Sequence, residues 1–280
     1  MKKFEFKVGE KFNNYKTIDF LKGIGISSVI IQKIKFSGVY INERKINNVN
    51  ERVEMGNKVK IVLPEDEGNS YVVPILGKLN ILFEDDYLLA VVKERGMLTH
   101  CSKSNTQPAL DQLVCGYFLP NKFTFRAINR LDRDTSGIVL IAKDMLTASL
   151  LGEQMKKGLI KKTYWATVVG KPIEKHFFIE KPIKRQNQNS MIRVCAPDGK
   201  YAKTECTVIK QLEENKCILE IDLHTGRTHQ IRVHLASIGL PLYADNLYGT
   251  AVENETYSLC AKKLKFTHPF TGEELLLVLN

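Results

Sequence analysis

Two acids and two bases fall within five residues near the middle of the chain, in the segment INRLDRDTSG at residues 128–137. They directly precede the apolar run at residues 138–142, which is typical of a buried strand. A carboxylate can act as a covalent nucleophile when its neighbours keep it ionised and oriented. Arg130 and Arg133 could supply the charge for Asp132, and the DTSG sequence that ends the segment predicts a tight turn. The segment fits either a reactive aspartate or a solvated turn between two elements.

A second cluster of polar residues opens the segment HTGRTHQIRVHLASIGLPLYAD at residues 224–245. Thr228 is expected to cap a helix that ends at Gly239. The residues expected to face the core from this helix are Ile231, Leu235 and Ile238. Backbone N–H groups and the helix dipole favour anions at such an N-terminus. Three side chains that could bind an anion gather there: Arg227, His229 and Gln230.

Arg232 lies one turn into the same predicted helix. A buried arginine needs an acidic partner, and Asp132 is a candidate. The three histidines of this segment, His224, His229 and His234, are spaced five residues apart, so neither a helix nor a strand presents all three on one face. We therefore predict no metal site and expect each histidine to be structural or to contact an anionic partner.

The third segment, KKTYWATVVG at residues 161–170, alternates in the manner of a strand. Tyr164 follows two lysines in it. Taken alone, this pattern is also typical of a tyrosine at the edge of the core with its hydroxyl in water.

Composition and charge narrow the class of protein. The 280 residues are 44% hydrophobic and carry a net charge of +10, with a pI of about 9.2, which favours polyanionic partners, nucleic acid before anionic membranes. Neither an apolar run of membrane-spanning length nor a signal peptide is present, so a cytoplasmic protein is expected. The six cysteines include no C-x-x-C pair, which indicates reduced thiols rather than disulfides or a zinc site.

The basic charge is concentrated at the N-terminus. Residues 1–64 hold 13 Lys and Arg against 6 Asp and Glu, whereas the remainder holds 28 against 25. The acidic stretch PEDEGNS at residues 64–70 indicates a linker, so we predict domains at residues 1–70 and 71–280. In the first domain we expect two short helices, the second running from Ser27 or Ser28 to Gly38, followed by a small sheet.

From about Lys78 onward the patterns predict a mixed α+β fold in which neighbouring strands are mainly antiparallel. The predicted strands lie in residues 80–94, 137–143, 162–170, 202–212 and 216–224, with a turn at 213–215. The predicted helices lie in residues 108–119 and 144–158, besides the one after Thr228.

Together, the segments resemble the RluA-type pseudouridine synthases, which isomerise uridine to pseudouridine in structured RNA. That family shows HRLDxxTSG, KxYxAxVxG and GRxHQxRVHxxxxGxPxxGD, and this chain shows NRLDRDTSG, KKTYWATVVG and GRTHQIRVHLASIGLPLYAD in the same order. The chain departs from these patterns at Asn129 and Ala244. It also departs at Glu94, in the segment ILFEDDYLLAVVKERGMLTH at residues 81–100, where the family usually has proline after the lysine. None of the three is a proposed reactive residue. The first domain resembles the small α/β RNA-binding domain of ribosomal protein S-four, through Gly38, VYINER and VEMGNKV.

The resemblance implies a role for each matching residue. Asp132 would be the catalytic aspartate, held by a salt bridge from Arg232. Tyr164 would stack on the target base, and Arg130 would fill the space that the flipped uridine leaves. The residues that would shape the pocket are Leu131, Thr135, Ser136, Gly137, Gly226, Arg227, Thr228, His229 and Gln230. In the first domain, the expected phosphate contacts are Lys33, Lys35, Arg44 and Lys45.

The implied reaction needs no cofactor and no metal, because nothing is oxidised or phosphorylated. Asp132 could attack the anomeric carbon or take a proton from the neighbouring ribose carbon, and both routes stay open. Ribosomal and transfer RNA are both open as partners, the loop at residues 185–200 is expected to contribute to site choice, and a monomer is expected.

Two other functions fit single features. The sequence DRDTS at residues 132–136 matches the D-x-D-x-T pattern of haloacid-dehalogenase-type phosphatases, but there an apolar strand precedes the first aspartate, whereas here it follows. A non-catalytic RNA-binding or ribosome-assembly protein would also use the basic N-terminus. The presence of Asp132, Tyr164 and Arg232 together favours the enzyme over that alternative.

Overall fold

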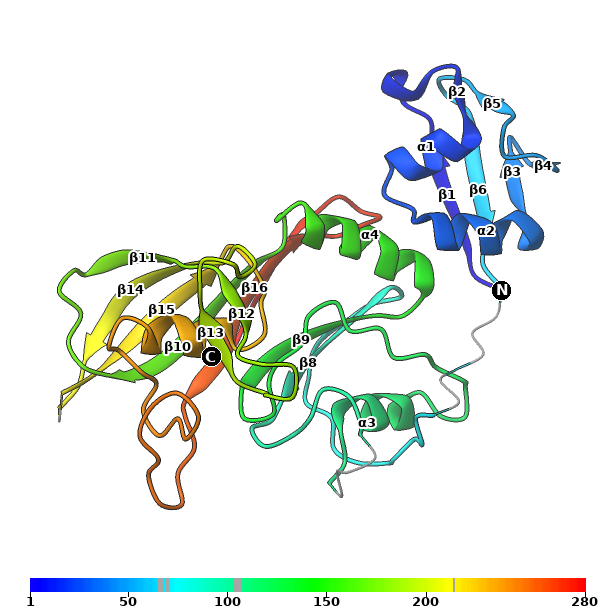
Figure 1. Ribbon diagram of the computed structural model, residues 1–280. Helices are drawn as coiled ribbons and strands as arrows, with labels where there is room; N and C mark the ends of the chain where they lie inside the picture. The colour runs from blue at the N-terminus through cyan, green and yellow to red at the C-terminus, as the bar shows by residue number, and fades with distance from the viewer. Residues whose placement is uncertain (65–67, 69–70, 103–106, 214) are drawn as a thin grey trace.

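The computed structural model describes residues 1–64, 68, 71–102, 107–213 and 215–280 (Figure 1). Most of the predicted linker at residues 64–70, and Glu214 of the predicted hairpin turn, lie outside the described residues. Among the described residues, no helix combines the length and the apolar character needed to cross a membrane.

Residues 1–64, called the N-terminal unit below, contain a four-stranded sheet in the order β1-β6-β3-β4. Its elements are β1 (Lys3–Lys7), β2 (Tyr15–Lys16), α1 (Thr17–Gly23), α2 (Ser28–Ser37), β3 (Val39–Ile41), β4 (Arg44–Ile46), β5 (Arg52–Val53) and β6 (Lys58–Val62). The second predicted helix is confirmed, but the expected order of helices followed by a sheet is wrong. Strand β1 precedes the helices and pairs antiparallel with β6, because its alternating sequence KFEFK buries Phe4 in the core.

The rest of the chain is built on a 9-stranded sheet in the order β11-β14-β15-β10-β16-β9-β8-β7, with β17 also paired to β16. The strands are β7 (Ile81–Glu84), β8 (Leu88–Lys93), β9 (Ser136–Ala142), β10 (Lys161–Val169), β11 (His176–Glu180), β14 (Lys203–Gln211), β15 (Lys216–Leu223), β16 (Leu259–Thr267) and β17 (Glu274–Val278). Strands β9 and β16 run parallel and the other neighbours are antiparallel. The predicted α+β class with a mixed, mainly antiparallel sheet is therefore confirmed.

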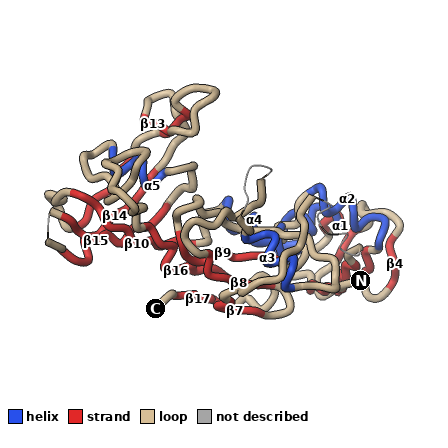
Figure 2. The backbone as a smooth tube through the Cα atoms, turned by 90° about the horizontal axis from the view of Figure 1, so that it is seen from below, coloured by secondary structure: helices blue, strands red, loops and turns tan. Residues whose placement is uncertain are grey.

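Three helices cover this sheet: α3 (Leu110–Tyr117), α4 (Met145–Lys156) and α5 (Gln230–Ala236). Apolar residues of α3 and α5 belong to the main core, whereas Leu151 of α4 packs on alternate residues of β8 and β9. Side chains alternate between faces along a strand, so α4 covers the opposite face from α3. Figure 2 shows α5 near β10, β14 and β15, with the N-terminal unit at the other end of the molecule.

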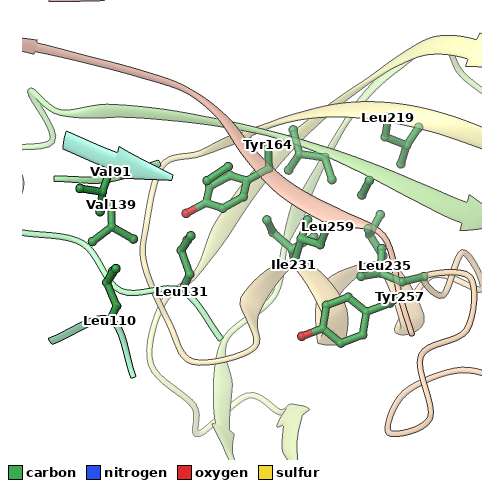
Figure 3. Close-up of a cluster of buried hydrophobic side chains, with 14 of the residues drawn as sticks. Val91, Leu110, Leu131, Val139, Tyr164, Leu219, Ile231, Leu235, Tyr257 and Leu259 are labelled. Atoms are coloured by element: carbon green, nitrogen blue, oxygen red, sulfur yellow. The ribbon is translucent and has the colours of Figure 1, made fainter. Parts of the chain in front are cut away.

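The main core brings the three signature segments together (Figure 3). Leu131 precedes β9, Tyr164 lies on β10, and Ile231 lies on α5, and all three are buried in one apolar cluster. Packing in this core therefore positions Asp132 and Arg232, because each directly follows a residue that is buried in it, Leu131 and Ile231.

The N-terminal unit also packs on the rest of the chain. Leu146 and Leu150 of α4 belong to its apolar cluster. Lys2 Nζ lies 2.8 Å from Asp144 Oδ2, and the backbone N–H of Ser27 donates to Ser149 Oγ. The N-terminal unit therefore packs against α4, and residues of both form one apolar cluster.

Candidate active site

A cleft of about 890 Å³ is lined by all three signature segments. Asp132, Tyr164 and Arg232, predicted as catalytic, all line it. The other predicted residues along its wall are Arg130, Leu131, Thr135, Gly226, Arg227, Thr228, His229 and Gln230. Ser136, Gly137 and the four basic residues of the N-terminal unit are not among the residues that line this cleft.

Asp132 lies in a turn at the start of β9, where the backbone N–H of Thr135 donates to its carbonyl. Thr99 Oγ1 donates to the carbonyl of Leu131, which fixes the preceding residue. Gly137 has a φ of +119°, and a Cβ there would meet the carbonyl oxygen of Ala261 at 2.4 Å. The segment is therefore a tight turn that presents the Asp132 carboxylate to the cleft, and the apolar strand follows it, unlike in the phosphatase pattern.

The charges around Asp132 differ from those expected. Arg133 does not hold the Asp132 carboxylate, because its Nε and Nη2 donate to Asp134 at 3.0 and 2.9 Å. Arg130 is exposed on the cleft wall. Among the described residues, the basic side chain closest to the Asp132 carboxylate is His229, whose Nε2 lies 3.9 Å from Asp132 Oδ2. The carboxylate itself is about one-third exposed, at 33%.

Tyr164 is buried in the main core, with 6% of its surface exposed, and the same residue lines the cleft. Burial raises the pKa of the Tyr164 hydroxyl far above its usual value, and the charge of Asp132 raises it further. The phenol consequently stays protonated at neutral pH. A ring beside Asp132 suits stacking on a base, and the neutral hydroxyl can donate a hydrogen bond.

Arg232 does not form the predicted salt bridge with Asp132. Its Nε and Nη2 each donate to the Asp245 carboxylate at 2.7 Å, in a bidentate pair, and Asp245 is fully buried. The buried carboxylate of Asp245 has no water to stabilise its charge, whereas the carboxylate of Asp132 is partly in water. Arg232 therefore pairs with Asp245. Burial lowers the pKa of Arg232, but the hydrogen bonds to Asp245 outweigh it together with nearby charges, of which Asp132 contributes least, so the pKa is raised. Asp245 is the last residue of the third family motif. Its presence in that motif could have identified it as the partner of Arg232.

The helix that carries Arg232 begins later than predicted. His229, rather than Thr228, occupies the N-terminal cap position, with a left-handed φ of +56°. Gln230 is buried, and its side chain bonds the backbone of Arg227 and Lys203, so its role here is to hold the loop. Ile238, expected in the core, is 38% exposed because α5 ends at Ala236.

The three histidines of the segment at residues 224–245 have separate surroundings. His224 bonds Glu205, and His234 bonds Thr204 and the carbonyl of Lys181. Within the part of the chain that the structure describes, no group of three or more His, Cys, Asp or Glu residues could hold a metal ion.

Lys93 is a residue of this site that the sequence patterns did not single out. It is fully buried at the end of β8, and its Nζ donates to the carbonyls of Glu94, Met97 and Arg133. Burial lowers its pKa to about 8, although the charges of Asp134 and Asp132 oppose the shift. Lys93 thus ties the loop after β8 to the turn that carries Asp132.

We expect Lys93→Met to destabilise the protein by about 2 kcal/mol, since three hydrogen bonds are removed while the cost of burying an ammonium is also removed. Urea unfolding followed by circular dichroism measures the change. Lys143→Met is the matched control. It removes a lysine outside the site that donates to Glu84 and to the carbonyl of Asp85. Equal stability of Lys93→Met and the natural protein would show that the three carbonyls find other donors.

The sequence of this chain matches those of known RNA pseudouridine synthases. The family model described as RNA pseudouridylate synthase matches residues 87–237, which include Asp132, Tyr164 and Arg232. RNA pseudouridine synthase YhcT of Bacillus subtilis is 36% identical over 275 residues, which cover 96% of this chain and 90% of that protein. Ribosomal large subunit pseudouridine synthase D of Nitrosomonas europaea is 32% identical over 238 residues, which cover 81% and 69%.

The fold agrees with these sequence matches. The solved structure of human RNA pseudouridylate synthase domain containing 1 superposes with a TM-score of 0.61 at 22% identity, covering 72% of this chain and 83% of that one. The family model spans more than half of the chain, and YhcT matches almost all of it. The chain therefore belongs to the RNA pseudouridine synthase family of RluA type, whose members are isomerases that act on RNA.

Proposed function

We propose that this enzyme converts specific uridines of structured RNA to pseudouridine, with Asp132 as the catalytic aspartate. The observation that carries the proposal is that one cleft collects Asp132 and Arg130 from one segment and Tyr164 from another. Ribosomal or transfer RNA is the substrate. The name of the Nitrosomonas relative favours the ribosomal large subunit.

The reaction breaks the bond from ribose to N1 of uracil, turns the base, and joins C5 of the base to the ribose. C5 loses its proton to water and N1 takes up a proton from water, so the product is an isomer of the substrate. The ionised Asp132 acts at the ribose, by attack on the anomeric carbon or by removal of a proton from the adjacent carbon. The target base must leave its stack, which costs a few kcal/mol. Stacking on Tyr164 and insertion of Arg130 into the vacated space offset that cost.

Arg232 acts on this site indirectly in our proposal. Its guanidinium donates two hydrogen bonds to Asp245. Arg232 therefore stabilises the wall of the cleft instead of bonding Asp132. The rings of Tyr257 and Tyr248 lie 4.4 and 5.0 Å from its Cζ and complete its surroundings.

The test measures tritium released to water from RNA labelled at C5 of uridine, prepared from cells that lack this gene. We expect release by the purified protein without added metal or cofactor, and sequencing of the product then names the modified uridine. Binding of the RNA without release of tritium would contradict the proposal and favour a non-catalytic RNA-binding protein.

We further propose that the chain has two domains, residues 1–70 and 71–280, and that the first is an S-four-like module that contacts RNA phosphates. Lys33, Lys35 and Lys45 support this, because their side chains are exposed. Arg44 is exposed too, although its Nη2 bonds Glu51 at 2.7 Å, which makes it the weaker candidate.

Replacing Lys33, Lys35 and Lys45 together by glutamine should weaken RNA binding without slowing the bound enzyme. For every lysine that binds a phosphate in the natural protein, the slope of log affinity against log salt should fall by about 1. Filter binding at several salt concentrations measures the slope. Lys156→Gln, on α4, is the control, because it removes a surface lysine that already lies 3.7 Å from the Glu153 carboxylate. An unchanged slope would show that these lysines do not touch the RNA.

A further inference from the structure

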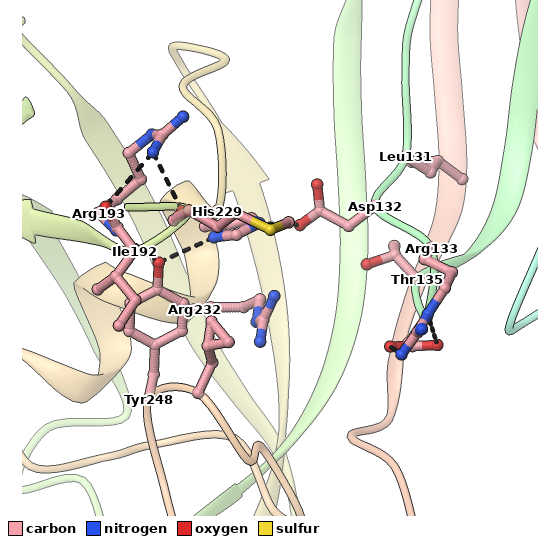
Figure 4. Close-up of polar contacts among 12 residues, drawn as sticks. Leu131, Asp132, Arg133, Thr135, Ile192, Arg193, His229, Arg232 and Tyr248 are labelled. Carbon is pink, nitrogen blue, oxygen red and sulfur yellow. Dashed lines mark hydrogen bonds and ion pairs between the residues drawn. The ribbon is translucent and has the colours of Figure 1, made fainter. Parts of the chain in front are cut away.

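Two hydrogen bonds link the hairpin of β12 (Ile183–Arg185) and β13 (Arg193–Cys195) to His229, whose ring lies beside the carboxylate of Asp132 (Figure 4). The backbone N–H of Arg193 donates to Tyr248 Oη at 2.8 Å. Tyr248 Oη lies 2.8 Å from Nδ1 of His229. His229 lies between Tyr248 and Asp132, so its second ring nitrogen faces the carboxylate.

One arrangement of protons gives every donor in this chain of contacts an acceptor among the described residues. The backbone N–H of Arg193 can only donate, so the oxygen of Tyr248 accepts there. For the phenol proton, the described residues offer one acceptor, His229 Nδ1. Nδ1 is then an acceptor, and the ring proton of neutral His229 resides on Nε2, 3.9 Å from Asp132 Oδ2.

The surroundings of His229 favour this neutral form. Burial lowers the pKa of His229, the charges of Arg232 and Arg193 lower it further, and those of Asp132 and Asp245 oppose the shift. At neutral pH the ring is therefore an uncharged donor through Nε2.

The backbone around this chain is held in an unusual conformation. His229 is a non-glycine residue in the left-handed region, which costs roughly 1 kcal/mol and persists where other contacts impose it. Asp245 Oδ1 accepts the backbone N–H groups of Leu247 and Tyr248, and the same carboxylate pairs with Arg232. Arg232 thus reaches Asp132 through Asp245, Tyr248 and His229 rather than directly.

We propose that His229 is a positioning residue that orients the Asp132 carboxylate through its Nε2–H, and that the Tyr248 hydroxyl fixes the required tautomer. The inference deepens the proposed function and rests on Asp132 as the catalytic group. A hydrogen bond needs an approach about 1 Å closer than the 3.9 Å observed, which rotation of the partly exposed Asp132 side chain can supply. The hairpin that ends at β13 enters the same network, so an RNA seated against it is coupled to the reacting carboxylate.

The first test reads the ring nitrogens of His229 by ¹⁵N NMR and does not depend on activity. We expect the Nε2–H tautomer in the natural protein and a mixture of tautomers in Tyr248→Phe. The pKa of His229 should rise in Tyr248→Phe, because the hydroxyl that stabilises the neutral ring is absent. It should fall in Asp132→Asn, because a carboxylate that favours the imidazolium is removed. An unchanged tautomer in Tyr248→Phe, or an unchanged pKa in Asp132→Asn, would overturn the proposal even if the protein proved inactive on every RNA.

The second test uses steady-state kinetics. His229→Asn keeps a residue type that tolerates left-handed backbone but cannot reach Asp132, and should lower kcat about 100-fold with KM nearly unchanged. Tyr248→Phe should lower kcat about 10-fold, and the double variant should be no slower than His229→Asn, because both act through one interaction. Tyr243→Phe, which removes a hydroxyl bonded to Glu255, is the matched control. A rise in KM alone for His229→Asn would instead make His229 an RNA contact.

Discussion

Asp132→Asn should reduce tritium release from C5-labelled uridine by about 1,000-fold or more while RNA binding stays within about twofold. The amide has nearly the shape of the carboxylate but has neither its charge nor its basicity. The Asp132 side chain is about one-third exposed and lies 3.9 Å from its nearest basic neighbour, so the substitution leaves the fold intact. Loss of activity in this variant therefore reports on chemistry at the ribose, and the tritium assay measures it directly.

Asp134→Asn is the matched control, because Asp134 lies two residues away and bonds exposed Arg133. We expect its rate to stay within about threefold of the natural protein, since surface ion pairs contribute little. Equal losses in the two variants would show that the turn, rather than the carboxylate of Asp132, limits the rate. Retention of a tenth of the activity by Asp132→Asn would remove Asp132 from the reaction.

The elements that carry the site follow from short-range patterns, which is why the sequence predicts them. The apolar run of β9 and the alternation of β10 each reflect how one strand faces the core. Asp144 begins α4 by accepting the backbone N–H of Thr147, a local interaction that its residue type favours. Strand β1 could not be predicted because five residues, KFEFK, alternate too briefly to be distinguished from a charged terminus.

The position of the N-terminal unit could not be predicted, because the apolar residues of α4 serve two cores. Leu151 packs under the large sheet, whereas Leu146 and Leu150 pack against the N-terminal unit. The sequence of the helix shows that these residues are apolar but not which partner each one meets. Lys93 is a comparable case, since its three carbonyl acceptors come together only in the folded chain.

The partner of Arg232 shows the same limit within the site. The sequence indicates that a buried arginine needs a carboxylate, and the family resemblance favours Asp132. The structure selects Asp245, whose burial leaves it no solvent to stabilise its charge. Which of two acids is buried more deeply is a property of tertiary packing and is not encoded in the spacing of residues.

Asp245→Asn should therefore destabilise the protein by about 3–5 kcal/mol, because it leaves the Arg232 guanidinium buried without a counter-charge. Asp132→Asn should change stability by less than about 0.5 kcal/mol, since that carboxylate is partly in water and makes no close ion pair in the described structure. Urea unfolding of the two variants, read by circular dichroism, compares them. The opposite ranking would mean that Arg232 is paired with Asp132 in solution.

A double-mutant cycle separates the ion pair from the hydrogen bonds that Asp245 accepts from the backbone of residues 247 and 248. Asparagine can still accept those bonds, so the destabilisation of Asp245→Asn belongs mainly to the charge. Adding Arg232→Met removes the unpaired cation and should restore about half of the missing stability. Activity should not return with it, because the wall that Arg232 and Asp245 build also carries Tyr248 and His229. The double variant therefore separates stability from catalysis: methionine can restore the packing, but it cannot replace the guanidinium whose pair with Asp245 supports the loop that carries Tyr248.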